Sequence, residues 1–150
     1  MLDVPKADEG RSRHFARGGP NAGVIEVLVT KTGDGQKPNE ILCSITPKRG
    51  SEHYVNNNTI TLPGYGGPFE VIFDLVEPLE WQESDPFDSQ KGTCPPRGGS
   101  CTDQIWLQPP NGSSLSVLNL NGGSPCEVHY RMNFADGTWC DPIMDNGGNS

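Results

Sequence analysis

Five cysteines offer the clearest chemistry in this sequence. Cys94 and Cys101 flank a six-residue segment rich in proline and glycine, so their side chains would face each other if that segment closes a hairpin. If the protein matures in an oxidising compartment, we expect these two residues to form a disulfide that staples the loop. An odd number of cysteines leaves at least one thiol unpaired in the monomer, and a reducing compartment would keep all of them as thiols.

The pairing of the other cysteines depends on a turn near the end of the sequence. Asp136-Gly137 is a strong signal for a two-residue hairpin turn, which would set Asn133 opposite Cys140. In that register Cys126 and Cys140 point to opposite faces, so we expect that they do not bond to each other. A pairing of Cys126 with Cys43 is favoured instead, although sequence alone leaves the connectivity open.

No other set of residues has the spacing of a metal or catalytic site. The cysteines include no C-x2-C pair, so a zinc site completed by His129 is not indicated. The acidic residues between Glu77 and Asp88 do not match the calcium-loop pattern, and a solvated acidic surface explains them. The three histidines are scattered, and no nucleophile motif is present. We therefore predict no catalytic residue, no metal ligand and no cofactor, and expect that the protein is not an enzyme.

Aromatic and basic side chains remain as candidates for a binding surface. Alternation places Trp106 out of phase with Ile105 and Leu107, which predicts an outward-facing indole. By the same rule, and with the two-residue turn, Trp139 should face the core beside Phe134. The residues with which we expect the protein to bind a ligand are Trp106, His129, Arg131, Tyr65 and Trp81, the last two at a rim.

Short strands would position these candidates. Phe69, Val71, Phe73 and Leu75 share one face of the clearest strand, and their neighbours include Glu70 and Asp74. Similar runs lie near residues 24–30, 41–45, 60–62, 105–107, 115–120 and 128–134. The turn signals between most of them have the spacing typical of sandwiches and barrels. We therefore expect an all-β fold, an antiparallel two-sheet β-sandwich of about seven strands with an immunoglobulin-like form.

Composition narrows the partners and the organisation of the chain. Residues 1–22 lack any apolar pattern and predict a flexible, disordered N-terminal arm, and residues 23–150 predict a single β-sandwich domain. The net charge of −8 argues against nucleic acid, and no apolar run is long enough to span a membrane. The absence of a signal peptide favours the cytoplasm, whereas an exported protein is expected if the sequence is a mature form.

The end of the sequence resembles a known group of proteins. Residues 130–146, YRMNFADGTWCDPIMDN, contain a strand, a turn and an Asp-Pro. This stretch is similar to the closing hairpin of small uncharacterised bacterial β-proteins of the DP-EP type. The resemblance implies a bacterial sandwich domain without an assigned activity, and it transfers no functional residue.

These observations favour a non-enzymatic domain that works by binding or by structural association. A protein partner or self-association is favoured over a small molecule. The alternative is a carbohydrate-binding module, assisted by calcium, which would show a row of exposed aromatic side chains.

Overall fold

The computed structural model describes residues 23–63, 68–89, 105–121 and 126–146. In these ranges the fold is all-β, with a single 3-10 turn, η1 (Glu52–Tyr54). None of the described residues belongs to a helix with the length and apolar character needed to cross a membrane. The predicted arm at residues 1–22 lies outside the described residues, and so do Tyr65, Cys94 and Cys101.

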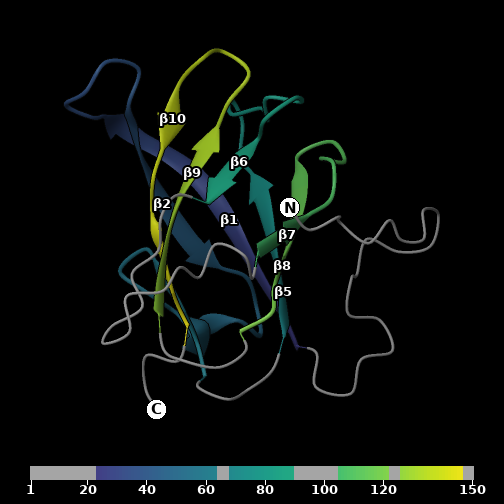
Figure 1. Ribbon diagram of the computed structural model, residues 1–150. Helices are drawn as coiled ribbons and strands as arrows, with labels where there is room; N and C mark the ends of the chain where they lie inside the picture. The colour runs from purple at the N-terminus through teal and green to yellow at the C-terminus, as the bar shows by residue number, and fades with distance from the viewer. Residues whose placement is uncertain (1–22, 64–67, 90–104, 122–125, 147–150) are drawn as a thin grey trace.

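The described strands form two sheets (Figure 1). The first sheet has the order β2-β1-β5-β8-β7, made by β1 (Gly23–Asp34), β2 (Ile41–Pro47), β5 (Phe69–Leu75), β7 (Ile105–Leu107) and β8 (Ser114–Asn119). The second has the order β10-β9-β11-β4-β3, made by β3 (Val55–Asn56), β4 (Thr59–Leu62), β9 (Cys126–Asn133), β10 (Trp139–Cys140) and β11 (Ile143–Asn146). A further strand, β6 (Phe87–Ser89), pairs with β9. Alternation predicts seven of these strands, and β3, β6, β10 and β11 are additional.

The expectation of antiparallel order throughout is wrong for two strand pairs. β5 runs parallel to β1, with Phe73 beside Val27, and β11 runs parallel to β4, with Met144 beside Ile60. The physical reason is the path of the chain. After β2 it enters the second sheet to form β3 and β4, and it then returns to lie beside β1 in the same direction. Both sheets are therefore mixed, and an immunoglobulin-like arrangement is not confirmed.

The two sheets share one hydrophobic core. Phe73 of the first sheet has no exposed surface and packs against Tyr130 of the second, with 5.6 Å between the ring centroids. Phe87 of β6 stacks on the same tyrosine ring at 4.9 Å. Alternate residues of β1 and β9 face this core, as the period-two pattern predicts.

β10 and β11 are two parts of one strand that returns along β9. Cys140 pairs with Met132 and Ile143 pairs with His129, so the same antiparallel register continues from β10 into β11. Pro142 falls between the two parts, opposite Tyr130, where it accepts a hydrogen bond of 3.3 Å through its carbonyl but has no N–H to donate. The interruption therefore follows from the proline and not from a change of direction.

Candidate functional site

The closing hairpin has a longer loop than the sequence suggested. Phe134 N–H donates to the Thr138 carbonyl at 2.9 Å, which leaves three loop residues, Ala135, Asp136 and Gly137. Gly137 has a φ of 91°, the left-handed conformation that closes a three-residue hairpin loop. The predicted two-residue turn is therefore wrong.

The extra loop residue moves every later side chain to the other face. Trp139 pairs with Asn133 instead of Phe134, and Cys140 pairs with Met132 instead of Asn133. Trp139 thus lies on the outer face of the second sheet, and Cys140 enters the core with 4% exposed surface. The predictions that Trp139 faces the core and that Cys140 lies on the opposite face are both wrong, because the loop has one more residue than expected.

The same register gives a different reason why Cys126 and Cys140 do not bond to each other. Its backbone pairs with that of Asn146, whereas Cys140 lies opposite Met132, six residues further along β9. That separation amounts to about 20 Å at about 3.4 Å per strand residue, too far for a disulfide. Distance along the strand therefore separates the two residues. The structure does not form the favoured pairing of Cys43 with Cys126, because Cys43 is a free thiol that lies beside Cys140.

Trp139 forms a platform with Arg131. The guanidinium carbon of Arg131 lies 3.8 Å from the centroid of the indole, a stacked cation-π contact. Within the described part of the chain, Arg131 makes no ion pair or side-chain hydrogen bond, and its buried Nε has no acceptor. Asp88 is its backbone partner in β6, and the Asp88 side chain is exposed. The guanidinium of Arg131 is thus held in place by Trp139 without a polar partner among the described residues.

His129 lies one step along the same face. Its Nε2 is 3.4 Å from Oε1 of Glu127, and both side chains are partly exposed. Asp145 pairs with Glu127 across β11, and burial, together with the charge of Glu127, raises the pKa of the Asp145 carboxyl. The outer face of β9 and its neighbours therefore carries two predicted residues, His129 and Arg131, together with Trp139, which the sequence prediction missed.

Trp81 and Trp106, the other predicted ligand residues that the structure describes, do not join this face. Trp81 is 5% exposed, packs on Phe134 at 5.9 Å and donates from Nε1 to the Ser113 carbonyl at 2.9 Å. It is a core residue and not a rim residue. Trp106 pairs with Leu118 on the face of the first sheet away from the core, as expected, but it is half-buried and on the other sheet. No single site contains all of the predicted residues.

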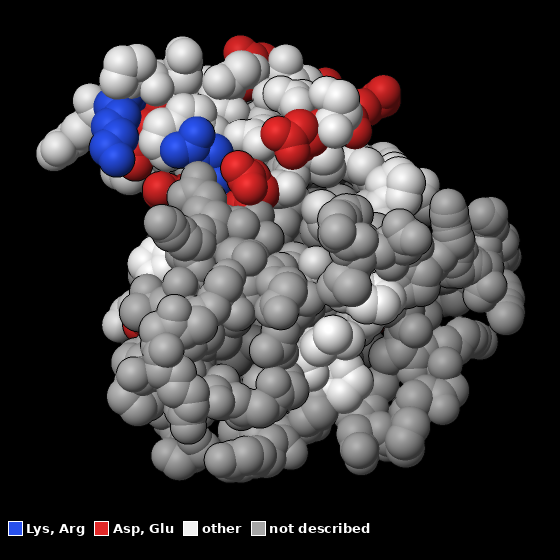
Figure 2. Space-filling model, viewed as in Figure 1, with Lys and Arg blue, Asp and Glu red and all other residues white. Residues whose placement is uncertain are grey.

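Acidic residues predominate in the loops at one end of the described structure. Figure 2 shows acidic and basic side chains together at the upper end of this view, where Figure 1 places the loops after β1 and β5 and the β9–β10 turn. These loops carry more acidic than basic residues, namely Glu40, Glu77, Glu80, Glu83, Asp85 and Asp136 against Lys37. Asp136 has a lowered pKa because it accepts hydrogen bonds from the Thr138 hydroxyl and backbone N–H. The platform on β9 therefore adjoins an acidic rim.

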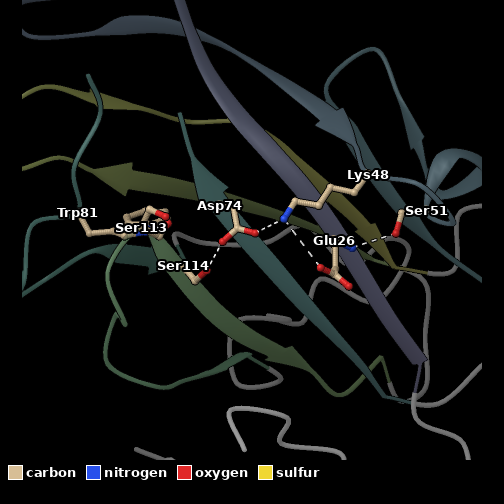
Figure 3. Close-up of polar contacts among 7 residues, drawn as sticks. All are labelled: Glu26, Lys48, Ser51, Asp74, Trp81, Ser113 and Ser114. Atoms are coloured by element: carbon tan, nitrogen blue, oxygen red, sulfur yellow. Dashed lines mark hydrogen bonds and ion pairs between the residues drawn. The ribbon is translucent and has the colours of Figure 1, made fainter. Parts of the chain in front are cut away.

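A second polar group lies on the outer face of the first sheet (Figure 3). Asp74 of β5 accepts hydrogen bonds from Lys48 Nζ and from the Ser114 hydroxyl, and Lys48 Nζ also lies 3.9 Å from Glu26. The Glu26 backbone N–H donates to Ser51 Oγ at 2.9 Å. The Lys48 amine and the Ser114 hydroxyl both donate hydrogen bonds to the Asp74 carboxylate. We interpret the group as a structural link across β1, β5 and β8.

A shallow groove lies beside the β9–β10 turn. Its volume is about 250 Å³, and it is lined by Pro78, Leu79, Glu80, Phe134, Ala135 and Asp136. That volume lies below the range typical of small-molecule pockets. Its two carboxylates are accompanied by no nucleophile or cation in the lining.

The described residues include no group of three His, Cys, Asp or Glu side chains placed to hold a metal ion. In comparisons with known proteins, no family model matches the chain and no curated protein shows significant sequence similarity.

Proposed function

We propose that the protein is a non-enzymatic binding domain whose contact face is the outer side of the second sheet, centred on Arg131 and Trp139. The observation that carries this proposal is the guanidinium stacked on the indole without an acceptor among the described residues. The Nε atom is itself buried, whereas the side chain as a whole is partly exposed, so the terminal Nη donors of Arg131 are the ones that an acceptor from a binding partner would meet.

The geometry of the guanidinium favours a carboxylate as that acceptor. Stacking on Trp139 holds the planar fork of Arg131 in one orientation, and a carboxylate matches the fork with two parallel hydrogen bonds. Tryptophan and arginine are also the residues that most often dominate protein–protein binding energy. A protein partner therefore fits this face better than a neutral small molecule.

The acidic rim indicates which charges the rest of the partner should carry. Asp88 lies opposite Arg131 in the sheet, and Asp85 accepts a hydrogen bond from Asn133 Nδ2 through its backbone carbonyl, so its carboxylate remains at the rim. A strongly acidic partner would be repelled by these groups. The partner we propose is a protein segment that presents one carboxylate to Arg131 and basic side chains to the acidic rim.

Peptide titration tests this function. Calorimetry would compare a short peptide carrying one glutamate between lysines with the same peptide carrying glutamine, and with an all-glutamate peptide. We expect the lysine–glutamate peptide to bind best. Arg131→Ala should weaken it about tenfold or more, the loss of a charge-assisted pair. Arg49→Ala is the matched control, because Arg49 is an exposed arginine in a turn outside this face.

The alternative is a carbohydrate-binding module, and the half-buried indole of Trp139 is the observation that favours it. Oligosaccharides with and without uronic acids would enter the same titration. Sugar binding that Trp139→Ala removes and Arg131→Ala leaves intact would replace the protein-partner proposal with this one. Equal binding of the glutamate and glutamine peptides would reject the role of Arg131.

A further inference from the structure

Cys43 and Cys140 come from different sheets and meet where the sheets approach at one edge. Trp139, the residue before Cys140, forms a bridge with Glu40, the residue before β2, and its N–H donates to the Asn39 carbonyl at 3.0 Å. Figure 1 shows β2 and β10 side by side at this edge. The backbone contact therefore holds β10 of the second sheet against β2 of the first.

Both thiols point into the space between the sheets. Cys140 lies beside Met132 in the core, and Cys43 packs against the core from the face of β2 that also carries Ile41 and Ile45. The two side chains are in hydrogen-bonding contact. This approach brings together two cysteines that are far apart in the sequence and that belong to opposite layers.

The two thiols differ in access and in acidity. Cys43 is partly exposed, whereas Cys140 is buried. The hydrogen bond from Cys140 lowers the pKa of Cys43 despite the opposing effect of burial, and Lys31 adds a smaller lowering. The same hydrogen bond, followed by burial, raises the pKa of Cys140. Cys43 is thus the thiol that ionises first and that a reagent from solution reaches first.

We propose that Cys43 and Cys140 are a redox pair that exchanges with a small-molecule disulfide and closes a covalent link between the two sheets. The Cys43 thiolate attacks one sulfur of the disulfide, a mixed disulfide forms, and one thiolate leaves and takes up a proton. Cys140 then loses its proton and attacks the Cys43 sulfur, which expels the second thiol. The small molecule is reduced to two thiols, and the protein is oxidised by two electrons.

The link would act on the edge where the sheets meet. Most of the described chain lies between Cys43 and Cys140 in the sequence, so the disulfide would close a long loop. A disulfide that closes a long loop stabilises the folded state strongly. We expect oxidation to raise the midpoint of thermal unfolding by about 5 °C or more. Reduction with dithiothreitol should restore the lower value.

Peptide mapping of the full chain tests the pair. The protein would be reduced, incubated with oxidised glutathione, quenched with acid and N-ethylmaleimide, digested and mapped by mass spectrometry. We expect a Cys43–Cys140 peptide from the native chain. Cys140→Ser should stop the reaction at a glutathione adduct on Cys43, and Cys43→Ser should leave Cys140 without an adduct.

The map of the native chain decides the matter without any variant. Recovery of both residues as maleimide adducts at every ratio of oxidised to reduced glutathione would overturn the proposal. So would a link from either residue to Cys94, Cys101 or Cys126. An adduct that persists on Cys43 in the native chain would show that Cys140 does not resolve it, which also overturns the pair.

Discussion

The indole Nε1 of Trp81 donates a hydrogen bond of 2.9 Å to the backbone carbonyl of Ser113. This contact joins the loop after β5 to the turn that precedes β8, two segments that no strand pairing connects directly. Figure 3 shows the two residues at one end of the polar group on the first sheet. The bond therefore fixes the position of a loop that also lines the groove beside Asp136.

Trp81→Phe removes this hydrogen bond and keeps an aromatic ring in the core. We expect a loss of about 0.5–1.5 kcal/mol in the free energy of unfolding, because the Ser113 carbonyl keeps the hydrogen bond from the Leu75 N–H and loses only the one from the indole. Urea unfolding followed by circular dichroism measures it. Trp106→Phe is the matched control, since the buried Nε1 of Trp106 has no acceptor among the described residues. Equal losses in the two variants would contradict the role given to the bond.

Phe73→Ala should be among the most destabilising single changes in the core. Its ring has no exposed surface and packs against Phe87 and Tyr130, so truncation leaves a cavity between the sheets. We expect a loss of about 3–5 kcal/mol in the free energy of unfolding. Leu42→Ala, at a side chain with 51% exposed surface, should cost less than about 0.5 kcal/mol. An effect below about 1 kcal/mol for Phe73→Ala would contradict its place in the core.

Tyr130→Phe should stabilise the protein, unlike most core changes. The Tyr130 hydroxyl is buried and has no hydrogen-bond partner in the part of the chain that the structure describes. Phenylalanine keeps the ring in the core, and the substitution removes the cost of burying an unpaired hydroxyl. We expect the free energy of unfolding to rise by about 1 kcal/mol. Thermal and urea unfolding at neutral pH measure the gain. A loss of stability would reveal a partner for the hydroxyl.

Alkaline pH should destabilise the reduced protein, and Tyr130 is one cause. Burial raises the pKa of Tyr130 well above its ordinary value of 10.0, with smaller contributions from Cys140 and Cys43. Above that ordinary value the unfolded chain releases the proton and the native chain keeps it, so a rise in pH favours unfolding. The neutral Tyr130 side chain therefore makes its full contribution to the free energy of unfolding below about pH 10. Above that pH the contribution falls, by at most about 1.4 kcal/mol per pH unit.

The tyrosine contribution can be separated from that of the buried thiol. Cys140 acts in the same direction, because its pKa is also raised, and its loss begins near its ordinary value of 9.0. Urea midpoints of the native chain and of Tyr130→Phe would be compared between pH 8 and pH 11. We expect the variant to lose less stability than the native chain above about pH 10. Parallel pH profiles would contradict the assignment.

Local pattern was sufficient to predict most strands and their inward faces. Val27, Phe73 and Tyr130 all face the core because apolar residues recur at every second position of their strands. The parallel pairs could not be predicted in this way, since alternation in β1 or β5 is the same whichever direction the neighbour runs. Strand direction depends on where the chain crosses between sheets, which is a non-local property.

The candidate site was predicted only in part, and one loop residue explains the rest. His129 and Arg131 follow from alternation in β9, whereas the place of Trp139 depends on the length of the turn. The sequence does contain a signal for the longer loop. Asp136 accepts from the N–H and hydroxyl of Thr138, the local hydrogen bonding that aspartate favours in turns. The meeting of Cys43 and Cys140 has no local signal at all.

The position of β11 has a consequence for the order in which the chain is synthesised. β11 lies between β9 and β4 and pairs with both, although β4 was made more than eighty residues earlier. On the ribosome, β4 therefore has no partner on that side until Ile143–Asn146 have emerged. An unpaired strand edge is a surface to which other chains can add. This fold leaves that edge open through most of translation and closes it with the last strand that the structure describes.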